Sequence, residues 1–180
     1  KMPRKLKVGF SNSPKNLAHV TYRDLGFAAR EDGMFDVYSA GGLGNHARMG
    51  VKVGEAVKPE KILYYIKAMW LTFRAYGNYE NRGKARTRYM QETLGGPKQY
   101  REAFLQKLKE VEESGENLDV FPETEPVTKE GAGDHPLNAR VRAQKQPGLY
   151  TVVWHPLGGQ PGLESLTALA DTVRDMGAVE

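Results

Sequence analysis

The stretch of residues 24–40, DLGFAAREDGMFDVYSA, has the pattern of a strand pair joined by a turn. Its two largely apolar runs, residues 24–30 and 34–40, flank a turn sequence that contains Asp32 and Gly33. An Asp-Gly pair between two such runs is a strong hairpin signal, because both residue types tolerate the positive φ of a tight turn. This stretch therefore predicts two strands joined by a short turn.

Further strands are predicted on both sides of this hairpin. Residues 5–11 have a strand pattern and end at a turn-rich segment. Residues 51–53 and 119–121 are candidates for short strands, and residues 148–154 have a clear strand pattern.

Four segments are predicted to form helices. Residues 59–76 begin with a proline, repeat apolar side chains at three- and four-residue steps, and are followed by Gly77. A second helix is expected over residues 84–94, a third after Pro97, and a last amphipathic helix from Leu163. The third helix is expected to bury a stripe of four residues: Tyr100, Phe104, Leu108 and Val111.

The order of these elements predicts an α/β (more closely α+β) fold with a mixed sheet and helices mainly on one side. Residues 1–115 are expected to form this domain. Prolines and acidic residues mark residues 116–146 as a linker or long loop. Residues 147–180 have the pattern of a strand, a helix and the start of another strand. This pattern predicts a truncated half ferredoxin-like β-α-β unit.

Composition narrows the class of protein. The 180 residues include 39% apolar and 27% charged side chains, which is typical of a globular protein. No apolar run approaches the roughly 20 residues that span a bilayer. No signal-peptide pattern follows the basic start, so a cytoplasmic location is expected. The chain has no cysteine, which excludes disulfides, thiol catalysis and cysteine-ligated metals within it.

Positive charge is concentrated in the first half of the chain. Residues 1–95 carry 17 Lys and Arg against 8 Asp and Glu, a net charge of +9, whereas residues 96–180 have a net charge of −5. A basic half of this size indicates an anionic partner, such as a carboxylate-rich cofactor, an oxyanion, an acidic protein or nucleic acid. An ordinary solvated surface is the alternative.

Two groups of basic residues are candidates for the anion site. In a strand Lys5 and Lys7 project from the same face, where their mutual repulsion is relieved by an anion between them. The second group lies in one short segment and contains Arg82, Lys84, Arg86 and Arg88. These four share one face if the segment is extended, and pair at i,i+4 if it is helical. The four histidines have no metal-ligand spacing, so no metal site is expected.

Three motifs resemble, in the same order, those of the nitrite/sulfite reductase family of sirohaem and iron–sulfur enzymes. They are residues 2–11 (MPRKLKVGFS), 36–44 (DVYSAGGLG) and 77–89 (GNYENRGKARTRY). The resemblance covers about the first 115 residues well and the last forty more loosely.

The resemblance implies roles for the basic residues. Lys5 and Lys7 match the family's active-site lysines, which would hold the oxyanion and supply protons as its oxygens leave as water. Assimilatory nitrite reductases of the family tend to have asparagine where this chain has Lys7, which favours sulfite and leaves nitrite open. The residues implied to contact sirohaem or its carboxylates are Arg4, Arg82, Lys84, Arg86, Arg88, Gly41, Gly42 and Gly44.

The resemblance also implies the reaction and its partners. The whole enzyme would pass six electrons to sulfite or nitrite, from ferredoxin or a flavoprotein donor. The family holds its [4Fe–4S] cluster with four cysteines, and this chain has none. We therefore expect a fragment that needs the remainder of its polypeptide and is inactive alone. The alternatives are a non-catalytic module that binds a polyanion or nucleic acid, and a structural fragment that binds nothing tightly.

Overall fold

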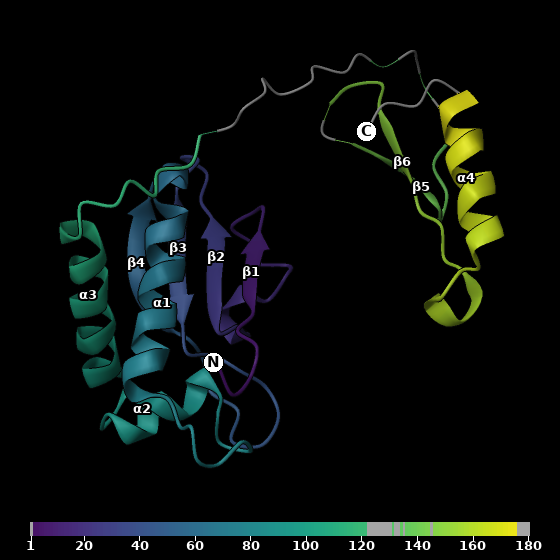
Figure 1. Cartoon of the computed structure of the whole chain (residues 1–180). Helices are drawn as coiled ribbons and strands as arrows, with labels where there is room; N and C mark the ends of the chain where they lie inside the picture. The colour runs from purple at the N-terminus through teal and green to yellow at the C-terminus, as the bar shows by residue number, and fades with distance from the viewer. Residues whose placement is uncertain (1, 122–130, 132–133, 135, 145, 176–180) are drawn as a thin grey trace. The chain divides into compact units, whose positions relative to one another are not determined.

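The computed structural model describes residues 2–121, 131, 134, 136–144 and 146–175. The chain divides into two compact units, Lys1–Pro122 and Glu123–Glu180 (Figure 1). None of the described helices is long and apolar enough to span a bilayer.

The first unit contains a four-stranded mixed sheet whose spatial order follows the sequence. Its strands are β1 (Val8–Ser11), β2 (Leu25–Ala29), β3 (Phe35–Ser39) and β4 (Val51–Val57). β1 is parallel to β2, and the β2–β3 and β3–β4 pairs are antiparallel. The predicted hairpin is confirmed: Leu25 lies opposite Ser39, and Gly33 has the positive φ of 79° that the turn requires.

Two long helices cover the same face of this sheet (Figure 1). The helical elements of the first unit are η1 (Val20–Tyr22), η2 (Pro59–Lys61), α1 (Ile62–Tyr76), η3 (Thr87–Tyr89), α2 (Met90–Thr93) and α3 (Pro97–Glu113). Phe27, Val37 and Val53 of the sheet are buried in one core with residues of α1 and α3. The stripe predicted for the third helix is confirmed, since Tyr100, Phe104, Leu108 and Val111 are all buried.

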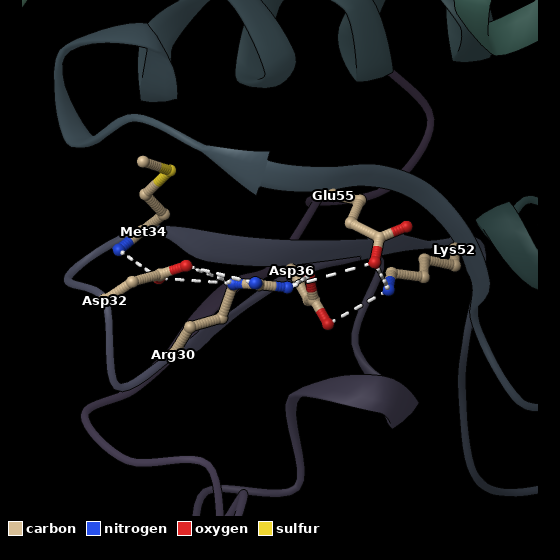
Figure 2. Close-up of polar contacts among 6 residues, drawn as sticks. All are labelled: Arg30, Asp32, Met34, Asp36, Lys52 and Glu55. Atoms are coloured by element: carbon tan, nitrogen blue, oxygen red, sulfur yellow. Dashed lines mark hydrogen bonds and ion pairs between the residues drawn. The ribbon is translucent and has the colours of Figure 1, made fainter.

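The opposite face of the sheet carries a network of charges (Figure 2). Asp36 of β3 alternates with the buried Val37, so its side chain points away from the core. Its carboxylate pairs with Arg30 at 3.2 Å and with Lys52 at 3.0 Å. Glu55 pairs with Lys52 at 3.4 Å, and Arg30 also pairs with Asp32 at 3.0 Å. These contacts connect β3 and β4 to the residues that follow β2, on the face of the sheet opposite α1 and α3.

Three element boundaries differ from the sequence prediction. β1 begins at Val8 rather than at Lys5, and the N–H of Lys7 donates instead to the side chain of Asp24. β4 runs on to Val57, four residues beyond the strand expected at 51–53. The expected helix over 84–94 shrinks to η3 and α2, because the chain before it forms a turn in which the N–H of Lys84 donates to the carbonyl of Asn81.

The second unit contains a two-stranded antiparallel sheet and a helix. Its elements are β5 (Val141–Ala143), β6 (Tyr150–Val152), η4 (Leu157–Gly159) and α4 (Leu163–Asp175). β6 and α4 correspond to the predicted strand and helix, while β5 lies in the segment expected to be a linker. The strand expected after the helix, and the linker positions 122–130, 132, 133, 135 and 145, lie outside the described residues.

The segment that follows α3 forms no strand at residues 119–121. The N–H of Val120 instead donates one hydrogen bond to the carbonyl of Glu60, at 3.1 Å.

The mixed sheet with helices on one side confirms the predicted fold class.

Candidate functional site

Two cavities of the first unit are lined by basic side chains, and Arg86 lines both of them. The Lys7 cavity, about 250 Å³, is lined by Lys7, His19, Tyr22, Arg23, Asp24, Gly42, Leu43 and Arg86. The Lys84 cavity, about 220 Å³, is lined by His46, Tyr76, Asn78, Lys84, Arg86, Tyr89, Met90, Glu92 and Thr93. The structure therefore brings residues of all three sequence motifs to one region.

A buried carboxylate joins two of these motifs. Asp24 precedes β2, and its side chain is only 1% exposed. One of its oxygens, Oδ2, accepts the N–H of Lys7 at 2.9 Å and pairs with Nη2 of Arg86 at 3.3 Å. The other, Oδ1, accepts the hydroxyl of Thr87 at 2.5 Å. Sequence reasoning missed Asp24, although a charged residue at the start of a buried strand is a signal, since such a charge needs partners.

The predicted lysines and Arg4 lie just before β1 and are exposed. Lys7 lines the cavity that bears its name, whereas Lys5 and Arg4 line neither cavity. The strand begins only at Val8, so Lys5 and Lys7 precede it, on either side of the partly buried Leu6. The backbone of Lys7 is instead fixed by Asp24.

The second basic group is divided among three environments. Lys84 and Arg86 line the Lys84 cavity, and Arg82 is exposed outside both cavities. Arg88 is buried, where its Nε and Nη2 donate to the carbonyl of Asn45 at 3.1 and 3.0 Å. Neither the extended nor the helical arrangement predicted for the four is formed, because a turn at residues 82–84 is followed by Ala85, Arg86 and then η3.

The glycine-rich loop packs closely against its surroundings. A β-carbon on Gly41 would stand 2.5 Å from the carbonyl oxygen of Thr21, and Gly44 has a φ of 98°. The N–H of Gly41 donates to the backbone carbonyl of Arg23, and the N–H of Gly42 donates to the backbone carbonyl of Arg48, each at 3.0 Å. Since the amides of Gly41 and Gly42 already have acceptors, these two glycines allow neighbouring atoms to pack closely and supply no free hydrogen-bond donors.

The guanidinium of Arg86 has an unused donor. Its Nε is buried and has no hydrogen-bond partner among the described residues. A buried polar group left unpaired costs about 1–3 kcal/mol, so this donor indicates an acceptor outside the described part of the chain. With Lys7, Lys84 and Arg23 nearby in the cavity walls, the acceptor that fits best is an anion.

Among the described residues, no group of three or more His, Asp or Glu side chains is placed to hold a metal ion. The chain has no cysteine, so it supplies none of the thiolates that hold an iron–sulfur cluster. The cationic cavities do fit a ligand that carries carboxylates, because arginine binds two carboxylate oxygens at once.

Comparison with known proteins gives a consistent result. Residues 1–112 match the family model described as the nitrite and sulphite reductase 4Fe-4S domain. The chain is 33% identical over 121 residues to the sulfite reductase [NADPH] subunit beta of Schizosaccharomyces pombe, covering 61% of this chain and 8% of that protein. It is 36% identical over 105 residues to the sulfite reductase [NADPH] hemoprotein beta-component of Thiocapsa roseopersicina, covering 52% of this chain and 18% of that protein.

A solved structure shows the same fold over a larger share of the chain. The NirA protein of Mycobacterium tuberculosis superimposes with a TM-score of 0.68 and 27% identity, over 97% of this chain and 30% of that one. The chain spans less than a fifth of the length of these curated relatives. The family model covers well over half of the sequence. The chain therefore belongs to the nitrite and sulphite reductase family.

Proposed function

We propose that this chain is the sirohaem-facing part of a sulfite or nitrite reductase. The observation that carries the proposal is the unpaired, buried Nε of Arg86 between two cavities lined by basic residues, in a chain of this family. The proposal assigns residues 1–115 to the sirohaem-facing domain, residues 116–146 to a linker or long loop, and residues 147–180 to a half ferredoxin-like unit.

The basic residues of the two cavities bind different ligands, the cofactor and the oxyanion substrate. Lys84 and Arg86 hold carboxylates of the tetrapyrrole, and Arg86 does so through the donors that Asp24 leaves free. When bound, sirohaem supplies the iron at which the oxyanion is reduced. The predicted contacts of Arg4, Arg82, Arg88 and the glycine loop with the cofactor are part of the same proposal.

Lys7 and Lys5 bind the oxyanion substrate and donate protons to it. Lys7 lines a cavity with Arg23 and Arg86, and the positive charges of these three residues attract an oxyanion. An ammonium group has three protons to donate, which suits a reaction whose oxygens leave as water. We favour sulfite as the substrate because the matching position in nitrite reductases tends to be asparagine.

Other parts of the enzyme come from outside this chain. The cluster thiolates have no counterpart here, because the chain has no cysteine. We propose that the remainder of the polypeptide supplies them, and that a ferredoxin or a flavoprotein supplies electrons. The names of these two sulfite reductases specify NADPH, which favours a flavoprotein donor.

The test is an absorbance titration of the chain with sirohaem. We expect a saturable Soret shift in the wild type and about tenfold to a hundredfold weaker binding in Arg86→Gln, the loss of one or two charge-assisted hydrogen bonds. Arg101→Gln is the matched control, because Arg101 is an exposed arginine on α3 outside both cavities. Lys84→Gln is compared in the same way with the exposed Lys98→Gln.

Two outcomes would contradict the proposal. One is the absence of any saturable shift with the wild-type chain. The other is equal weakening in Arg86→Gln and Arg101→Gln, which would indicate general charge attraction. Salt-sensitive binding of an oligonucleotide in place of sirohaem would favour the non-catalytic polyanion module instead.

A further inference from the structure

We propose that Asp24 is a positioning residue for the anion site, acting through Arg86. Its buried carboxylate fixes the guanidinium of Arg86 before any ligand arrives. This inference rests on the proposed function, since it assumes that Arg86 binds an anionic group of the ligand.

The carboxylate is itself held in one place. The backbone carbonyl of Asp24 accepts the hydroxyl of Ser39 and the N–H of Ala40, each at 3.0 Å, at the end of β3. Its side chain then receives the N–H of Lys7, Nη2 of Arg86 and the hydroxyl of Thr87. Asp24 therefore connects the end of β3 to two segments that lie 17 and 62 residues away in sequence.

A fixed partner at one end of the guanidinium orders the rest of it. An arginine side chain has about 2 kcal/mol of rotamer entropy to lose on binding. Because Asp24 holds Nη2, the buried Nε is already oriented while it still has no partner among the described residues. Ordering a group in its bound conformation improves affinity by reducing the entropy lost on binding.

Simple charge attraction predicts the opposite effect of removing Asp24. Among the described residues that line the Lys7 cavity, Asp24 is the one carboxylate, alongside Lys7, Arg23 and Arg86. If only net charge mattered, Asp24→Asn would make the site more positive and bind an anion more tightly. If Asp24 positions Arg86, the same substitution weakens binding.

The first experiment is a double-mutant cycle on sirohaem affinity. We expect Asp24→Asn to bind about tenfold more weakly, and Asp24→Asn/Arg86→Gln to bind no more weakly than Arg86→Gln alone. Ser39→Ala is the matched control, because it removes a hydrogen bond to the Asp24 backbone and leaves the carboxylate and Arg86 paired. Binding of Asp24→Asn as tight as wild type or tighter, or additive effects in the cycle, would overturn the inference.

The second experiment needs no ligand. In the ¹⁵N-labelled chain we expect the Nε–H of Arg86 to exchange slowly with solvent, to exchange faster in Asp24→Asn, and to remain slow in Ser39→Ala. Unchanged exchange in Asp24→Asn would overturn the inference whether or not sirohaem binds. If exchange is slow and depends on Asp24 but the wild-type chain fails to bind sirohaem, the proposed function is refuted. The inference that Asp24 orders the guanidinium of Arg86 is then supported.

Asp24→Glu covers the case in which Asp24→Asn does not fold. It keeps the charge and displaces the carboxylate by one methylene. We expect it to weaken sirohaem binding and to speed exchange at Arg86, whereas wild-type behaviour in both measurements would overturn the inference.

Discussion

Arg88 lies directly against Gly42. A β-carbon on Gly42 would stand 3.1 Å from Cδ of Arg88 and 3.3 Å from its Nη1. Arg88 also donates two hydrogen bonds to the carbonyl of Asn45 and lies over the ring of Tyr89, with Cζ 4.9 Å from its centroid. The arginine therefore binds to the glycine-rich loop itself, and Gly42 supplies the room for it.

Gly42→Ala is expected to lower the free energy of unfolding by about 1–3 kcal/mol, because the added methyl overpacks against Arg88. Urea unfolding measures the loss. The control is Gly42→Ala/Arg88→Ala, in which the methyl has no guanidinium to displace, so adding Gly42→Ala to Arg88→Ala should cost little. A Gly42→Ala penalty that persists in full without Arg88 would contradict this contact.

Gln91 is expected to hold both ends of the same loop. Its buried amide Nε2 donates to the carbonyls of Ala40 and Met49, each at 2.8 Å. Gln91→Leu leaves both acceptors unpaired and should cost about 1–3 kcal/mol for each that stays buried. Thermal unfolding beside the exposed Gln99→Leu tests this, and equal stability of the two variants would contradict it.

Tyr100 gives the fold a sensitivity to alkaline pH. Its hydroxyl lies 2.7 Å from that of Ser39, and burial raises the pKa of Tyr100 above its ordinary range despite this hydrogen bond. Since the folded state keeps the proton that the unfolded state releases, stability is full below the unfolded pKa of about 10 and is lost as pH rises above it.

The measurement is the melting temperature from pH 8 to pH 11 for the wild type and Tyr100→Phe. We expect a fall above about pH 10 in the wild type and a smaller fall in Tyr100→Phe, while the exposed Tyr79→Phe follows the wild type. Identical slopes for all three proteins would be inconsistent with a buried, neutral Tyr100.

Asp36 should make the sheet sensitive to acid. Although burial opposes it, the hydrogen bonds from Lys52 and Arg30 hold the pKa of Asp36 below its ordinary value (Figure 2). Stability from this network is therefore present above the unfolded pKa of about 4 and is lost as pH falls through the folded pKa. Because the network is partly exposed, each pair contributes less than about 1 kcal/mol.

Urea midpoints at pH 7 and pH 2.5 check the role of Asp36. Asp36→Asn should lower the midpoint at pH 7 and have a smaller effect at pH 2.5, because the stability from this network is lost as the pH falls through the folded pKa of Asp36. The exposed Glu112→Gln is the control, and a loss of stability in Asp36→Asn of the same size at both pH values would contradict the charge-based explanation.

The local pattern of the sequence predicts the fold well where each signal acts over a few residues. The Asp32-Gly33 turn fixes the hairpin, and the apolar stripe of α3 is buried as its spacing requires. The start of β1 and the short η3 and α2 could not be predicted in this way. The start of β1 depends on the hydrogen bond from the N–H of Lys7 to Asp24, which lies 17 residues away in sequence. The shortened helices follow a turn in which the N–H of Lys84 donates to the carbonyl of Asn81, and the apolar spacing of residues 84–94 does not indicate that turn.

The candidate site is predictable in its residue types and not in its arrangement. The motifs identified Lys7, Lys84 and Arg86, and these do line the two cavities. Nothing in the spacing of the basic residues shows that Arg88 binds a backbone carbonyl of the chain, or that Arg82 lies outside both cavities. Those outcomes depend on which basic side chains form contacts with other residues of the folded chain.

A crystal structure of the chain with sirohaem would show whether the buried Nε of Arg86 binds a carboxylate of the tetrapyrrole. We expect a tetrapyrrole carboxylate oxygen at about 2.7–3.2 Å from this nitrogen, with Asp24 still paired to Nη2. A tetrapyrrole bound elsewhere on the chain, with Nε of Arg86 still unpaired, would contradict the proposal.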